Sequence, residues 1–159
     1  MKRAAFLVVG VLWTVSSASA ESAMGNSALA LASLVAEHSP LVSLDDKSMM
    51  SQFIHANPNF AYLPNKKISV QADAVVCRQS NVDITERGCE LTFGAKKINI
   101  SGRKAHELFA TMREVGVPPD GAAGTIYESL SHLACSIDTE EVKQKAGGGA
   151  DCKFQPGAQ

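Results

Sequence analysis

Residues 68–94 read ISVQADAVVCRQSNVDITERGCELTFG and place two cysteines at the ends of a polar stretch. On either side, in 68–77 and 89–93, apolar and polar side chains alternate. A period of two is typical of a strand with one wet face and one buried face. The residues expected to face inward on the first strand are Ile68, Val70, Ala72, Ala74 and Val76. The sequence therefore predicts two strands joined by a polar loop.

The chain has four cysteines, which allow three connectivities. They are Cys77, Cys89, Cys135 and Cys152. Each neighbouring pair flanks a polar connection between expected strands, which favours one disulfide from Cys77 to Cys89 and another from Cys135 to Cys152. Disulfides that close such loops contribute about 3 kcal/mol each on the chain-entropy model. Disulfides persist in oxidising compartments, so this pattern favours an exported protein.

Metal and redox sites have short ligand spacings that this sequence lacks. No Cys-x-x-Cys or His-x-x-x-His pair is present, and the four histidines are isolated from one another in sequence. The histidines are His38, His55, His106 and His132. We therefore expect neither a metal nor a cofactor.

The N-terminal residues 1–20 have the layout of a secretory signal peptide. Lys2 and Arg3 precede a largely apolar run, 4–15, and Ala-Ser-Ala ends the segment. The run is too short to cross a bilayer, which needs about 20 residues. Cleavage after residue 20 would leave Glu21 first, which does not suit a lipoprotein anchor. We expect a periplasmic or secreted protein without a membrane anchor.

The charge balance argues against general nucleic-acid binding. Without Lys2 and Arg3, 13 of the 15 basic side chains remain beside 16 acidic ones, a formal net charge of −3. The basic residues concentrate in 66–113. Within that range Lys96, Lys97, Arg103 and Lys104 predict a positive patch. Such a patch would face an anionic envelope component or an unknown acidic protein partner.

Two helices are expected before the first strand, at 27–37 and 43–56. Ser43 offers the second helix an N-cap. After the strand pair, 97–101 completes a hairpin, and Ser101 offers an N-cap for a helix with an apolar stripe. The stripe consists of Ala105, Leu108, Phe109, Met112 and Val115.

The segment 122–137 fits two periodicities, and we predict a short helix to about residue 130 followed by a strand at 132–137. A further helical turn starts near Asp138, and 150–154 forms a last strand. The prediction is thus an α+β fold: N-terminal helices, a small antiparallel sheet with one packed helix, and two disulfides. After the signal peptide, 21–159 is expected to form a single domain. Its parts are a helical segment, 21–65, and a disulfide-stapled sheet and helix, 66–159.

A catalytic cluster is conceivable around Glu128, Ser129, Ser131 and His132, but sequence proximity is weak support because strand neighbours point to opposite faces. No Gly-x-Ser-x-Gly elbow is present. A small hydrolase is therefore a distant alternative, and we expect a protein without catalytic activity.

The favoured function is an exported, non-enzymatic binding or interaction protein held by disulfides. The alternative is a protease or hydrolase inhibitor that presents the loop between Cys77 and Cys89, because a constrained loop binds with a lower ordering cost. The displayed residues would be Asn81, Asp83, Ile84 and Arg87. Small exported inhibitors with two disulfides, such as the subtilisin-inhibitor type, are similar in size and compartment, though not in motif.

Overall fold

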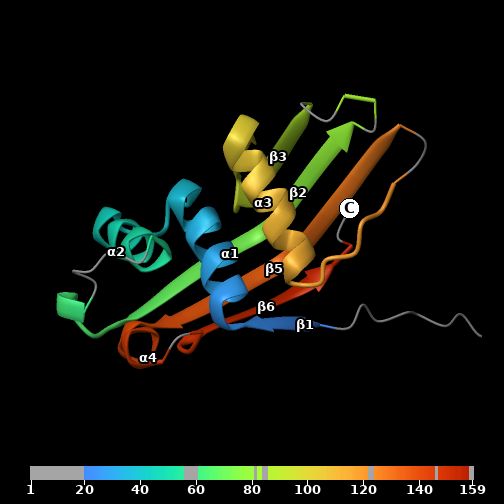
Figure 1. The fold of residues 1–159 in the computed structure, drawn as a ribbon. Coiled ribbons are helices and arrows are strands. Elements are labelled where there is room, and N and C mark those ends of the chain that lie inside the picture. The colour runs from blue at the N-terminus through green and yellow to red at the C-terminus, as the bar shows by residue number, and fades with distance from the viewer. Residues whose placement is uncertain are drawn as a thin grey trace, which may run out of the picture.

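The computed structural model of the chain describes residues 20–55, 61–80, 82–83, 86–121, 124–145 and 147–157. These residues form four helices and a six-stranded antiparallel sheet with the strand order β1-β6-β5-β2-β3-β4 (Figure 1). The α+β class expected from the sequence is therefore confirmed.

The elements follow one another in the order strand, two helices, three strands, helix, strand, helix, strand. The strands are β1 (Glu21–Met24), β2 (Lys67–Ser80), β3 (Arg87–Phe93), β4 (Lys96–Ser101), β5 (Thr125–Asp138) and β6 (Ala150–Pro156). The helices are α1 (Gly25–His38), α2 (Leu44–Ile54), α3 (Gly102–Glu114) and α4 (Thr139–Gln144).

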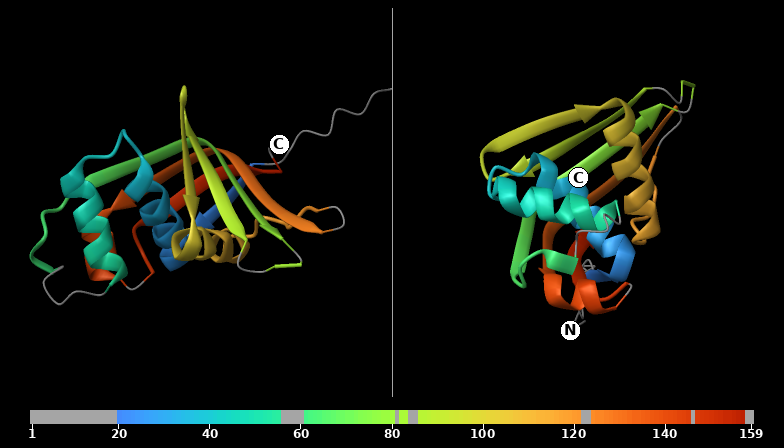
Figure 2. Two further views of the ribbon diagram at one scale, coloured as in Figure 1. Left: turned by 90° about the horizontal axis from the view of Figure 1, so that it is seen from above. Right: turned by 60° about the vertical axis from the view of Figure 1, so that its left-hand side comes forward.

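The core lies between one face of the sheet and the helices α1 and α3, which cross that face beside each other (Figure 2). Leu31 of α1 and Met112 of α3 are fully buried there. The helix α2 packs on α1. The Ser43 hydroxyl accepts a hydrogen bond from the Asp46 backbone N–H at 3.2 Å, so the N-cap expected at Ser43 is confirmed. On the opposite face of the sheet, no described helix covers β2, β3, β4 and the start of β5.

Both disulfides have the predicted connectivity. Cys77 pairs with Cys89, and Cys135 pairs with Cys152, each with a Cα–Cα distance of 4.0 Å. In both cases the two cysteines are directly opposite each other in neighbouring antiparallel strands. All four cysteines are buried on the helix-covered face. Each disulfide therefore joins a strand pair from its core side.

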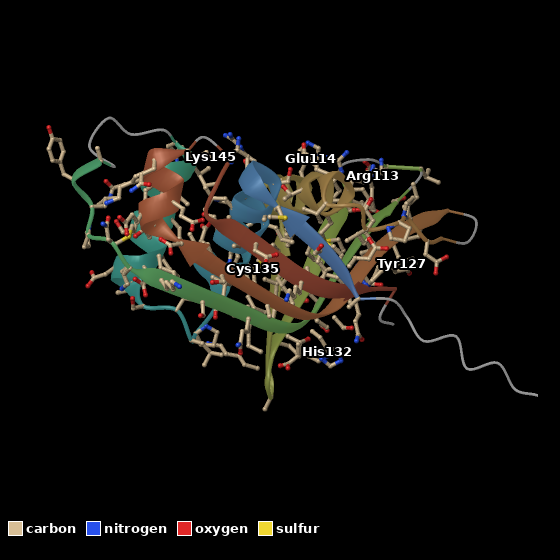
Figure 3. The ribbon with its side chains drawn as sticks, turned by 90° about the horizontal axis from the view of Figure 1, so that it is seen from below. Arg113, Glu114, Tyr127, His132, Cys135 and Lys145 are labelled. Atoms are coloured by element: carbon tan, nitrogen blue, oxygen red, sulfur yellow. A yellow bond between two sulfur atoms is a disulfide. The ribbon has the colours of Figure 1, made fainter. Side chains whose placement is uncertain are left out.

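The helix predicted up to residue 130 is wrong, because the chain forms one strand, β5, from Thr125 to Asp138. Pairing with β2 along most of this length satisfies the backbone groups that a helix would have bonded locally. His132, labelled in Figure 3, has a φ of 52° and is the only non-glycine residue in the described part of the chain with positive φ. The register between β5 and β6 shifts near this residue, which marks a β-bulge.

The inward face predicted for β2 is correct only in its first half. Ile68, Val70 and Ala72 are buried, but Val75 and Cys77 are then buried in place of the expected Ala74 and Val76. The change of phase at residue 73 lies opposite the bulge at His132. The two strands therefore turn together, and residues 76, 78 and 80 face away from the helices.

The hairpin of β3 and β4, the apolar stripe of α3 and the final strand β6 are confirmed. Ser101 occupies the expected N-cap position of α3, but its side chain makes no capping hydrogen bond to the described residues. The helix α4 starts at the predicted cap, where the Asp138 carboxylate accepts hydrogen bonds from the backbone N–H groups of Glu140 and Glu141. The strand β1 was not predicted. It pairs with β6 through Ala23 and Cys152 among others.

Candidate functional site

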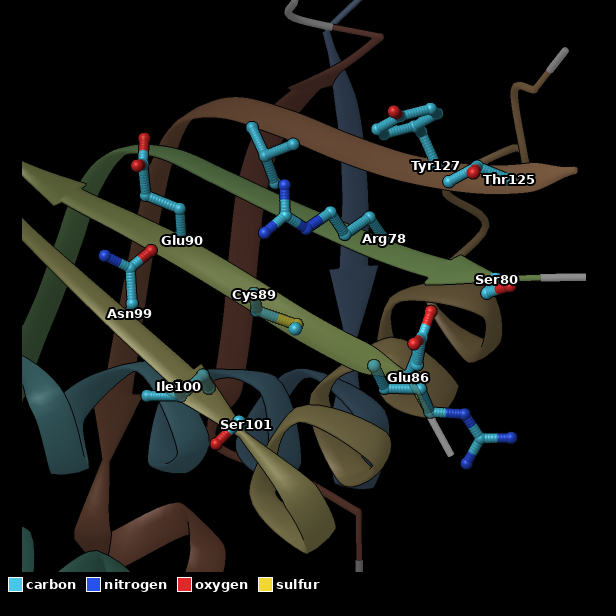
Figure 4. Close-up of a pocket in the computed structure, with 13 residues that line it drawn as sticks. Arg78, Ser80, Glu86, Cys89, Glu90, Asn99, Ile100, Ser101, Thr125 and Tyr127 are labelled. Atoms are coloured by element: carbon cyan, nitrogen blue, oxygen red, sulfur yellow. The ribbon is translucent and has the colours of Figure 1, made fainter. Parts of the chain in front are cut away.

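The face of the sheet that the helices leave uncovered carries an open groove of about 810 Å³ (Figure 4). This volume lies within the range of about 300–1,000 Å³ that is typical of ligand sites. The groove lies on β2, β3, β4 and the start of β5. Its polar lining residues are Arg78, Ser80, Glu86, Arg87, Glu90, Asn99, Ser101, Thr125 and Tyr127. We refer to it as the outer-face groove.

Strand register brings the central residues of the outer-face groove into one row. Arg78 on β2 is opposite Tyr127 on β5 and opposite Gly88 on β3, and Gly88 is in turn opposite Ser101 on β4. The backbone N–H and C=O of Tyr127 both bond to Asp120, so they are not available to β2. Arg78 and Tyr127 therefore form a non-hydrogen-bonded pair, in which opposite side chains lie closer together.

Arg78 is exposed at the centre of this row and has no carboxylate partner among the residues that the structure describes. Figure 4 shows its side chain lying across the sheet surface between Glu90 and Tyr127. The neighbouring Gly88 has no side chain to cover the guanidinium. A Cβ atom added at Gly88 would lie 3.9 Å from the Arg78 Nε, which is an ordinary van der Waals distance. The guanidinium is thus available to a ligand.

The acidic residues of the outer-face groove differ in their pairing. Glu90 is the diagonal neighbour of Arg78, but its carboxylate forms an ion pair with Lys97 at 2.8 Å. Glu86 is held through its backbone, since its C=O accepts from the Ser80 N–H and its N–H donates to Asp83. The groove consequently combines a free guanidinium with carboxylate, amide and hydroxyl acceptors.

A second arginine, Arg87, lies at the border of the groove and reaches α3. One of its terminal nitrogens donates to Nδ1 of His106, and its Nε is buried without a hydrogen-bond partner among the described residues. The contact fixes the end of β3 against the N-terminal part of α3.

A buried ion pair lies beneath the outer-face groove. Glu128 follows Tyr127 on β5 but points to the opposite face, where its side chain is fully buried. The Nε of Arg113, at the C-terminal end of α3, donates to Glu128 Oε1 at 2.6 Å, while Oε2 has no hydrogen-bond partner within the described part of the chain. Burial raises the pKa of the Glu128 carboxyl above its ordinary value, although Arg113 acts to lower it. Arg113 also lies over the Phe109 ring, 5.1 Å from its centroid.

The residues of the predicted positive patch are mostly paired with acids. Lys97 pairs with Glu90, Arg103 with Glu107, and Lys104 with Glu37, each at 2.8 Å. Lys96 is exposed. Lys96 and Lys97 belong to the β3–β4 hairpin, and Arg103 and Lys104 belong to α3. These pairs reduce the positive potential of the patch, and its role in binding stays a prediction.

The predicted display loop is shorter than the interval between its cysteines. The β2–β3 ladder continues beyond the disulfide, because Arg78 pairs with Gly88 and Gln79 with Arg87. Asp83 is exposed, whereas Arg87 belongs to β3 and is half-buried. Asn81 and Ile84 lie outside the described residues. The Ser80 hydroxyl accepts hydrogen bonds from the backbone N–H groups at positions 82 and 83, both at 3.2 Å.

The residues of the conceivable catalytic cluster are placed in different environments. Ser129 and Ser131 are buried, His132 is exposed, and the Glu128 carboxylate pairs with Arg113. Within the described part of the chain, His132 makes no hydrogen bond to either serine. The structure does not bring these groups together as a nucleophile, base and orienting acid.

Neither Arg78 nor Tyr127 was predicted as a site residue. The alternation predicted for residues 68–77 would place position 78 on the buried face together with Val76, and only the change of phase at residue 73 turns Arg78 to the wet face. Its neighbours Tyr127 and Gly88 depend on β5 and β3 flanking β2. Tyr127 was moreover assigned to a helix. No sequence signal marked the outer-face groove as a site.

Across the residues whose positions are described, no three His, Cys, Asp or Glu side chains are grouped as they would be around a metal ion. In the same parts of the chain, no helix has the length and apolar character that crossing a membrane requires.

Comparison with known proteins gives no assignment. No protein-family model matches the chain, and neither a curated protein nor a solved structure matches it.

Proposed function

We propose that this chain is an exported, non-enzymatic protein that binds a ligand in the outer-face groove. The observation that carries the proposal is the exposed Arg78 guanidinium, which lies in the groove without a carboxylate partner among the described residues. An exposed ion pair contributes little to the stability of a protein. An arginine that lies in a groove beside hydroxyl and amide groups is, in contrast, suited to binding an anionic group of a ligand.

Export is supported by two lines of argument. The two disulfides, both buried and both between opposite positions of neighbouring strands, are compatible with an oxidising compartment. The layout of residues 1–20 is that of a cleaved signal peptide. A periplasmic or secreted protein would meet anionic envelope components and other exported proteins as partners.

A capture experiment tests the binding function. The full chain, exported with its disulfides intact, is immobilised and exposed to the native envelope or secreted fraction, and retained material is identified by mass spectrometry. We expect Arg78→Ala and Gly88→Val to lose the ligand that the wild type retains. The first removes the charge, and the second places a side chain in the groove at a position where a Cβ meets only ordinary contacts.

Lys67→Ala is the matched control, because Lys67 is an exposed basic residue at the start of β2, outside the groove and the predicted patch, whose charge is already paired with Asp138. It should retain the ligand as the wild type does. Equal retention by all four proteins would contradict a role for the outer-face groove, and so would loss of the ligand by the control alone.

The inhibitor remains a second candidate because the tip of the β2–β3 hairpin presents an apolar side chain. Val82 is 91% exposed, and the Ser80 hydroxyl holds the backbone beside it. We expect an inhibitor to slow at least one protease of a broad panel and Val82→Asp to abolish the effect. Inhibition that survives Val82→Asp, or a panel without any response, would remove this candidate.

A further inference from the structure

Building on the proposed function, we infer that the ligand of the outer-face groove is a uronate-bearing saccharide. A ligand of this class combines a carboxylate, several hydroxyl groups and an apolar ring face. The polar and aromatic groups around Arg78 correspond to these three features.

The carboxylate is assigned to Arg78. A guanidinium has five N–H donors in a planar fork and binds a carboxylate through two parallel hydrogen bonds. Gly88 on one side leaves the fork uncovered, and the nearest acid along the diagonal, Glu90, is engaged by Lys97. The positive charge is therefore not neutralised from within the described part of the sheet.

The acids of the groove argue against a simple anion as the ligand. Glu86 and Glu90 both line the groove, and carboxylates repel phosphate or a second carboxylate. They accept hydrogen bonds from hydroxyl groups, however, as the amide of Asn99 also does. A saccharide supplies such donors on neighbouring carbons, next to its single charged group.

The remaining contacts suit the body of a sugar ring. Tyr127, opposite Arg78, is 39% exposed and offers an aromatic face for the C–H side of the ring together with a polar tip. Ser80 and Thr125 face each other on β2 and β5 and add two hydroxyl groups at the end of the groove. The open form of the groove suits a chain that enters and leaves it.

Binding of defined saccharides to the full chain with intact disulfides tests this inference by calorimetry. The probes are a galacturonate trimer, its methyl-esterified form, a hyaluronan tetrasaccharide and inorganic phosphate. We expect saturable binding of at least one of the two uronate chains. For a galacturonate trimer that binds, esterification should weaken binding about tenfold or more, since it removes the partner of Arg78.

The variants separate charge from shape. Arg78→Ala should lose about tenfold or more in affinity, and Arg78→Lys should lose less because it keeps the charge without the fork. Lys67→Ala should bind as the wild type does, because Lys67 lies outside the groove and the predicted patch. Near-ultraviolet circular dichroism confirms that each variant is folded, and Gly88→Val provides a second block of the groove that leaves Arg78 in place.

Three results would overturn the inference. They are the absence of saturable binding by both uronate chains, uronate binding that Arg78→Ala leaves unchanged, and phosphate binding as tight as that of the saccharides. If the capture experiment nevertheless yields a ligand that depends on Arg78 and Gly88, the binding function stands and only the ligand class is wrong. If that ligand is indifferent to both residues, the proposed function itself fails.

Discussion

Replacing Arg113 with methionine should lower the free energy of unfolding at pH 7 by about 3 kcal/mol, because the fully buried Glu128 carboxylate loses its partner. Its other oxygen already lacks a hydrogen bond. We expect a loss at the lower end of the range for breaking a buried ion pair, because the Arg113 side chain is 51% exposed. Urea unfolding of the variant and the wild type measures the difference.

The loss should depend on pH in a defined direction. Burial raises the pKa of Glu128 above its ordinary value of 4.5, so the folded state binds its proton at a higher pH than the unfolded state does. Between the unfolded and folded pKa values this carboxyl makes the protein less stable as the pH rises. Without Arg113 the folded pKa rises further, so the deficit of Arg113→Met should shrink as the pH falls toward 4.5.

Two controls isolate the buried charge. The double variant Arg113→Met/Glu128→Gln should recover much of the loss at pH 7, because no unpaired carboxylate remains. Arg103→Met breaks only the exposed pair with Glu107 and should change stability by less than about 1 kcal/mol. A deficit of Arg113→Met that is the same at pH 7 and near pH 4.5 would show that the buried carboxylate is not its cause.

Removing either disulfide by a pair of Cys→Ala substitutions should cost about 3 kcal/mol of unfolding free energy, by relieving the constraint on the unfolded chain. The two bonds close loops with sequence separations of 12 and 17. Loop-closure entropy depends weakly on length, so the two losses should agree within about 0.5 kcal/mol apart from differences in packing. Urea unfolding under non-reducing conditions measures both.

The two disulfides should nevertheless differ in their effect on binding. The Cys77–Cys89 bond lies one residue from Arg78 and Gly88, at the base of the outer-face groove, whereas Cys135–Cys152 joins β5 to β6. Loss of the first bond should weaken ligand binding more than loss of the second in variants of equal stability. Peptide mapping that found a crossed pair, or equal losses of binding in the two variants, would contradict this arrangement.

Local signals predicted most of the elements correctly where one periodicity dominated. The residues of the α3 stripe and of the β3–β4 hairpin each fit a single periodicity, and the capping residue Ser43 marked the start of a helix. The residues of β5, in contrast, fit both a helical and a strand periodicity. Its long pairing with β2 decided between them, and residues distant in sequence supplied that partner.

The candidate site was much less predictable than the fold. One of the pairs that reduce the charge of the predicted patch, Lys104 with Glu37, joins α3 to α1 across 67 positions of sequence. The row of Tyr127, Arg78 and Gly88 likewise depends on β5, which pairs with β2 although β3, β4 and α3 lie between them in the chain. Neither arrangement has a local pattern that could announce it.

Residues a few positions apart were enough to predict most of the periodicities, the cap at Ser43 and the preference of each cysteine for its neighbour. Contacts between distant segments were needed to make residues 125–138 one strand, to change the face of β2 opposite His132, and to leave Arg78 beside Tyr127 without a carboxylate partner among the described residues. The physical reason is strand order: backbone hydrogen bonds between distant segments choose the neighbours of each side chain. Those neighbours determine whether a charge is neutralised or left for a ligand.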